Sequence, residues 1–217
     1  CGHYGSGKTT FSINYALYLR NQTSKDIYIA DLDVVNPYFR SREHFDYLKD
    51  KNIKVIGSYL PQSGADLPAV SAEVYTLFDN KNIIGIVDMG GNSAGSLSFA
   101  TFRDNVDIEE TDIIFILNAN REENSTLEFA LGHFNSIEST LGLKITGIVN
   151  NTHLMNDTTI EDINKGELIS SELSKEKNIP VKFTCINMDF FDNNPNIKTK
   201  YDLFLIGYDI KTVTNII

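Results

Sequence analysis

The chain has 217 residues, of which 41% are hydrophobic and 22% are charged, and its formal net charge at pH 7 is −10. These values are typical of a globular domain and exclude a low-complexity disordered chain, a collagen and a coiled coil. The acidic balance argues against direct binding of nucleic acid, and the sequence has no apolar run of eighteen or more residues that would predict a transmembrane segment. Two cysteines, Cys1 and Cys185, are too few for a disulfide framework and favour a reducing, cytoplasmic location.

Apolar periodicity predicts helices and strands that alternate along the chain. In chain order we expect a helix over Thr9–Arg20, strands over Asp26–Asp33 and Asn52–Tyr59, a helix over Ser71–Phe78, a strand over Asn82–Asp88, a helix over Ser93–Phe102, a strand over Asp112–Leu117, a helix over Glu122–Leu141, a strand over Lys144–Asn150, a helix over Thr159–Lys177 and a strand over Ile179–Cys185. The tail after Asp189 has no clear pattern. Alternating strands and helices indicate βαβ units, so we expect one α/β domain over residues 1–217, with a doubly wound, mostly parallel sheet flanked by helices.

The segment Gly2–Thr9 reads GHYGSGKT and satisfies the phosphate-loop pattern G-x-x-x-x-G-K-[ST] in full. Its glycines allow positive φ angles and close approach of the backbone to phosphate, and the following helix directs its positive end to the same place. Lys8 can reach the β- and γ-phosphates, and the Thr9 hydroxyl can bind Mg²⁺. The residues expected to contact the nucleotide here are Gly2, Gly5, Ser6, Gly7, Lys8, Thr9 and Thr10.

A phosphate loop normally follows a strand, and this loop begins directly after Cys1. We therefore expect the first strand of the sheet to lie upstream of Cys1. A less favoured alternative is a mature lipoprotein, which can begin with a cysteine.

Acids and amides end several expected strands, where ligands bind in open α/β sheets. Asp88 follows a continuous apolar run, which suits a Mg²⁺ ligand acting through water, and Gly91 lets the chain approach a γ-phosphate. Asp33 could orient or activate the attacking water; alternatively it lies in the second shell of the Mg²⁺ or caps a helix.

Four segments, GHYGSGKTTF, DLDVVNPYFRSRE, DMGGNSAG and GIVNNTHL, together resemble the CobQ/CobB/MinD/ParA group of P-loop NTPases, which belongs to the SIMIBI class. The resemblance implies ATP as ligand, Mg²⁺ as cofactor and a nucleotide-sandwich homodimer in many members. It also implies roles for single residues: Lys8 as the phosphate-loop lysine, Thr9 as a Mg²⁺ ligand, Asp33 as the switch acid, Asp88 as the Walker B acid, Gly91 as the switch glycine and Asn151 as the amide that contacts adenine.

One position departs from this family. Its ParA and MinD members read K-G-G-x-G-K-[ST], whose first lysine reaches the partner's nucleotide, and here His3 and Tyr4 stand at the Lys-Gly pair. His3, Arg40 or Arg42 could supply the missing cation, although a solvated or ion-paired arginine is the plainer interpretation of the latter two. Because no NKxD guanine motif follows Asn150, we expect ATP rather than GTP.

Three functions remain open from the sequence. The first is a Mg²⁺-dependent ATPase that passes its nucleotide state to a protein partner or a second subunit through switch loops. The second is an ATP-dependent ligase or kinase that acts on a small molecule. The third is a nucleotide-binding module with negligible hydrolysis, which the missing lysine favours.

Overall fold

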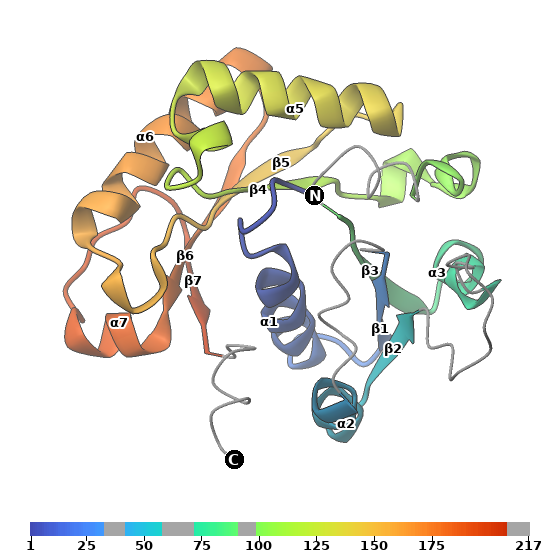
Figure 1. Ribbon diagram of the computed structural model, residues 1–217. Helices are drawn as coiled ribbons and strands as arrows, with labels where there is room; N and C mark the ends of the chain where they lie inside the picture. Colours follow the sequence, from blue (N-terminus) through green and yellow to red (C-terminus); the bar gives the residue numbers. More distant parts are fainter. Residues whose placement is uncertain (33–41, 58–71, 91–98, 208–217) are drawn as a thin grey trace.

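The computed structural model describes residues 1–32, 42–57, 72–90 and 99–207, and in these ranges every strand pair is parallel (Figure 1). The strands are β1 (Asp26–Asp31), β2 (Ile53–Gly57), β3 (Ile83–Asp88), β4 (Ile114–Leu117), β5 (Gly147–Asn150), β6 (Val181–Asn187) and β7 (Leu203–Ile206). They form two sheets, with the orders β2-β1-β3 and β4-β5-β6-β7. The expected α/β class with a parallel sheet is confirmed.

Helices follow most of the strands. The α-helices are α1 (Lys8–Arg20), α2 (Arg42–Asp50), α3 (Thr76–Asp79), α5 (Leu127–Leu141), α6 (Ile160–Lys177) and α7 (Met188–Asn193). Short 3₁₀ helices cover Ala72–Tyr75, Arg103–Asn105, Ile108–Glu110, Glu122–Asn124 and Met155–Asp157. Among the described residues, none of these helices is long and apolar enough to cross a membrane.

Most expected elements are present, with differences at their ends. The helix expected over Ser71–Phe78 is a 3₁₀ turn followed by the short α3. The helix expected from Glu122 begins only at Leu127, because Thr126 has an extended backbone and caps α5 by accepting from the Phe129 N–H. Helices α2 and α7 and strand β7 were not expected, and the helix expected over Ser93–Phe102 lies largely outside the described residues.

Helix α1 joins the two sheets. On one side Ile13 and Ala16 pack against β1, in a cluster with the buried Ile27 and Ile29. On another side Phe11 packs in a cluster with residues of β4 to β7: Ile116, Val149, Cys185, Phe204 and Ile206. Figure 1 shows α1 between the sheets, and α5 and α6 on the opposite face of the β4–β7 sheet. The largest core cluster, which includes Phe115, Phe134 and Leu173, lies on that opposite face. The helix that follows the phosphate loop is therefore anchored on both sheets.

Strands β3 and β4 are not paired with each other, so the expected single sheet is divided in two. A cavity of about 630 Å³ borders their facing edges, and apolar side chains such as Ile86, Val87 and Ile114 contribute to its lining. Cys1 enters this region and pairs with β4 as a parallel strand would: its amine donates to Ile114 O (3.0 Å), and Ile116 N–H donates to Cys1 O (2.8 Å). The strand expected upstream of Cys1 stays a prediction.

Candidate functional site

The phosphate-loop segment leads into α1 at the carboxyl ends of the strands. Its glycines have backbone conformations that L-amino acids rarely adopt, with φ of 141° at Gly2, 73° at Gly5 and 81° at Gly7. A Cβ at Gly2 would lie 2.3 Å from the Ile116 carbonyl oxygen, and one at Gly7 would lie 2.4 Å from the Asn151 amide nitrogen. The three glycines are thus required both by conformation and, at these two positions, by close packing.

Two side chains of the loop, Lys8 and His3, contact backbone carbonyls in its first half. The buried Lys8 ammonium donates to the His3 carbonyl oxygen (3.2 Å), and the Ser6 N–H donates to the same oxygen (3.1 Å). His3 Nδ1 lies 2.9 Å from the Tyr4 carbonyl oxygen, and its Nε2 lies 3.3 Å from a carboxylate oxygen of Glu123. Both ring nitrogens of His3 thus face an oxygen atom. His3 is therefore placed between the loop backbone and Glu123.

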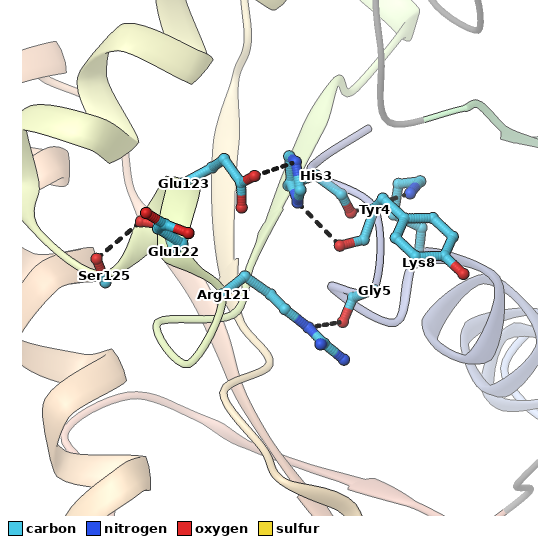
Figure 2. Close-up of polar contacts among 8 residues, drawn as sticks. All are labelled: His3, Tyr4, Gly5, Lys8, Arg121, Glu122, Glu123 and Ser125. Atoms are coloured by element: carbon cyan, nitrogen blue, oxygen red, sulfur yellow. Dashed lines mark hydrogen bonds and ion pairs between the residues drawn. The ribbon is translucent and has the colours of Figure 1, made fainter.

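The second half of the loop is held by residues from two distant segments. Gly5 O accepts from Arg121 Nε (3.0 Å) and from Asn118 Nδ2 (3.4 Å), while Ser6 O accepts from Asn151 Nδ2 (2.7 Å). Figure 2 shows Arg121 reaching from its own loop to Gly5. In a trans peptide the N–H points away from the C=O, so the contact of Ser6 O with Asn151 leaves the Gly7 N–H on the other side of the peptide. The Tyr4 carbonyl oxygen, which contacts His3 Nδ1, belongs to the same peptide as the Gly5 N–H, so the Gly5 N–H points away from His3. The loop is therefore held in a shape that offers N–H groups to an anion.

Thr9 and Asp88 form the second part of the site. The Thr9 hydroxyl donates to Asp88 Oδ2 (2.5 Å), at the point where β3 ends and the first turn of α1 begins. A hydroxyl and a carboxylate are hard oxygen donors of the kind that Mg²⁺ binds together with substrate phosphates. Among the described residues, no group of three or more His, Cys, Asp or Glu could hold a metal by itself. The donor set fits a Mg²⁺ that a bound phosphate helps to hold.

A small cavity adjoins the phosphate loop beyond β5 and β6. Its volume is about 70 Å³, and its lining combines the polar Asn151, His153 and Asn187 with the apolar Ile186 and Phe190. The lining also includes Cys185. Burial raises the pKa of its thiol far above the ordinary value, so Cys185 is not a reactive nucleophile.

The structure brings together most of the residues that the sequence nominated. Lys8, Thr9, Asp88 and Asn151 all meet at the phosphate loop. The amide of Asn151, expected to contact adenine, donates to Ser6 O and also lines the small cavity. Asp33, Gly91 and Arg40 lie outside the described residues, so their roles stay predictions.

Asn118 and Arg121 were missed from the sequence. Asn118 directly follows β4, and the rule that nominated the amides after β5 would also have nominated it. Arg121 carries no local signal, because it meets Gly5 across 116 residues of sequence.

No protein-family model matches the sequence. No curated protein matches it either.

Solved structures are similar in fold. The cell division protein FtsY of Thermotoga maritima superposes with a TM-score of 0.58 and 20% sequence identity, covering 86% of this chain and 60% of that one. The signal recognition particle receptor FtsY of Elizabethkingia anophelis, solved with GDP, gives a TM-score of 0.55 at 13% identity, covering 85% of this chain and 55% of that one. A nucleotide-binding protein of Archaeoglobus fulgidus, solved with ADP, gives 0.50 at 17% identity, covering 88% of this chain and 81% of that one.

These similarities show that the chain has the fold of P-loop nucleotide-binding proteins. The chain spans 60% or less of the length of these FtsY proteins. The neighbours carry different nucleotides and do not single out the CobQ/CobB/MinD/ParA group.

Proposed function

We propose that this protein binds ATP with Mg²⁺ at the Gly2–Thr10 loop and hydrolyses it as a nucleotide-state switch. The observation that carries the proposal is the hydrogen-bonded shape of the loop. The carbonyls of four consecutive residues, His3 to Ser6, each accept from a side chain. This arrangement fixes the loop before any ligand arrives, so little ordering is needed when an anion binds.

The electrostatics of the site support a polyphosphate ligand. The chain as a whole carries a net charge of −10, yet Lys8, Arg121 and the N-terminus of α1 gather at the loop. A locally positive site on an acidic protein attracts an anionic ligand, although the net charge of the protein repels it. Thr9 and Asp88 would hold the Mg²⁺, which neutralises part of the phosphate charge.

The lining of the small cavity supports adenine over guanine. Asn151 and Asn187 line it, and an amide can both accept from the adenine amino group and donate to a ring nitrogen. The cavity as described has no Asp or Glu in its lining, so the two adjacent N–H donors of guanine would find no carboxylate there. The SRP receptor neighbour was solved with GDP and the Archaeoglobus neighbour with ADP, so the fold accepts either base.

Hydrolysis and switching are the further part of the proposal. Asp33 would orient the attacking water, and the segments around Asp33 and Gly91 would change with the nucleotide and act on a protein partner or a second subunit. His3 stands where the ParA and MinD proteins that the loop resembles have a lysine that acts across a dimer, and in this structure His3 contacts Glu123. That contact favours the alternative of a module that binds nucleotide with negligible hydrolysis.

Binding and turnover should be measured separately. Calorimetric titration with ATP, GTP and ADP, with and without Mg²⁺, gives affinities for the wild type, Lys8→Ala and the matched control Lys198→Ala, which alters an exposed lysine. We expect ATP to bind more tightly than GTP, Lys8→Ala to lose binding, and Lys198→Ala to match the wild type. A wild type that binds neither triphosphate contradicts the proposed function.

Phosphate release is then followed over a range of protein concentrations. Specific activity that rises with concentration supports an ATPase that works through a dimer. Tight binding with turnover no greater than that of Lys8→Ala supports the module instead. Turnover that appears only when an acceptor is added supports a ligase or kinase.

A further inference from the structure

Arg121 is the residue at the loop that no sequence pattern nominated. It follows β4 in a turn in which the Arg121 N–H donates to Asn118 O (3.0 Å). From there its side chain extends to the phosphate loop, where Nε donates to Gly5 O (3.0 Å) (Figure 2).

The absence of a side chain at Gly5 is what allows this contact. A Cβ at Gly5 would lie 2.8 Å from the guanidinium carbon of Arg121. Such a distance is too short for two carbon atoms, so any other residue at this position would displace the arginine. The guanidinium therefore rests directly on the backbone of the phosphate loop.

The charge of Arg121 is not neutralised within the part of the chain that the structure describes, where no acidic side chain pairs with it. Nε makes the contact with Gly5, and the two terminal nitrogens belong to an exposed side chain. A guanidinium is always charged near neutral pH and presents its donors in a fixed fork that matches phosphate oxygens.

His3 is differently placed. Its Nε2 lies 3.3 Å from Glu123, and its Nδ1 faces Tyr4 O, so both ring nitrogens are already engaged. Arg121, by contrast, donates to the loop backbone through Nε alone and has no acidic partner in the described chain.

We propose that Arg121 is a second phosphate-binding cation of this site, which contacts a phosphate of the bound nucleotide from within the same chain. It would supply, from the loop after β4, a positive charge in place of the lysine that ParA and MinD proteins have at the position of His3. The inference rests on the proposed function, because it assumes that a nucleotide phosphate occupies the loop.

The test compares ligands that differ in their number of phosphates. ATP, ADP, AMP and inorganic tripolyphosphate, each with Mg²⁺, are titrated into the wild type, Arg121→Gln, Arg121→Lys and the control Arg103→Gln, which alters an exposed arginine at Asp104. We expect Arg121→Gln to weaken ATP and tripolyphosphate about 10- to 100-fold and AMP less than about 3-fold, as for loss of a charge-assisted hydrogen bond. Arg121→Lys should recover part of the loss, and Arg103→Gln should show none.

Three other results would overturn either the role of Arg121 or the proposed function. Equal loss for ATP and AMP in Arg121→Gln would mean that the residue only holds the loop in shape, and this overturns the proposal. Unchanged ATP affinity overturns it as well. A wild type that binds none of the nucleotides overturns the proposed function before any Arg121 variant is compared. Thermal unfolding of each variant is measured in parallel, so that a folding defect is recognised and Arg121→Lys then carries the comparison.

Discussion

The Thr9 hydroxyl donates a hydrogen bond to the Asp88 carboxylate across 2.5 Å, although the two residues lie 79 positions apart in the chain. The contact joins the first turn of α1 to the end of β3. Asp88 is 2% exposed, so its charge has little contact with water. A buried carboxylate beside a hydroxyl, next to a phosphate loop, is a natural place for a hydrated Mg²⁺.

Asp88→Asn should therefore reduce the effect of Mg²⁺ on ATP binding. The amide can still accept from Thr9, but it lacks the negative charge that attracts the ion, and we expect the Mg²⁺-dependent gain in ATP affinity to fall about tenfold or more. Titrations with Mg²⁺ and with EDTA measure this gain. Asp104→Asn, a change at an exposed acid, should leave it unaltered. An undiminished gain in Asp88→Asn would remove this residue from the metal site.

Asn151→Ala should weaken both the fold and the site. The Asn151 side chain is 4% exposed and donates to Ser6 O at 2.7 Å, so its removal leaves that carbonyl without this donor. We expect the free energy of unfolding to fall by about 1–3 kcal/mol, and ATP affinity to fall with it. Urea unfolding and ATP titration check the two effects, with the exposed Asn105→Ala as control. Loss of ATP affinity without loss of stability would favour a direct contact with the base over support of the loop.

Two helical glycines should respond in opposite ways to the same substitution. A Cβ at Gly166 in α6 would lie 2.2 Å from Asn150 Oδ1 and from Thr152 Oγ1. Gly166→Ala should therefore cost about 1–3 kcal/mol through overpacking, and should displace the residues that flank Asn151. A Cβ at Gly132 in α5 meets nothing within 4 Å, so Gly132→Ala should stabilise by up to about 1 kcal/mol. Urea unfolding of the two variants measures the change in the free energy of unfolding. An equal change in Gly166→Ala and Gly132→Ala would show that α6 does not pack tightly against β5.

The start of α6 should be sensitive to acid. Thr159 and Asp162 form a capping box, in which each side chain accepts from the other residue's backbone N–H. Burial raises the pKa of Asp162, but the hydrogen bonds from Thr159 and Asn120, with Lys165 nearby, outweigh it and lower the pKa below its ordinary value of 3.8. The ionised form is thus favoured in the folded state, and its stabilisation is present above this pH and is lost as the pH falls.

Thr159→Ala should cost about 0.5–2 kcal/mol at pH 7 and less at pH 3, because acid already weakens the box in the wild type. Unfolding in urea at the two pH values measures the difference. A cost that is the same at both values would mean that Asp162 does not contribute. ATP affinity should stay at the wild-type value in this variant, because the cap lies outside the phosphate loop.

The amino-acid sequence by itself determined the class of the fold and the centre of the site. The phosphate loop is eight contiguous residues whose conformation depends on their own glycines, and the apolar run before Asp88 marks a buried strand that must end at the ligand edge. Both signals are local, so periodicity and spacing suffice to find them. Strand β7 gave no such signal, because an apolar run of only four residues does not distinguish a strand from a helix.

The tertiary structure alone decided which side chains hold the loop. Arg121 and Asn118 meet Gly5, and Asn151 meets Ser6, across more than a hundred residues of sequence. These contacts exist because parallel strands bring their carboxyl ends to one edge, where the loops after β4 and β5 lie against the phosphate loop. A local pattern records which residue ends a strand but not which backbone carbonyl its side chain will reach, since that depends on how the sheet is assembled.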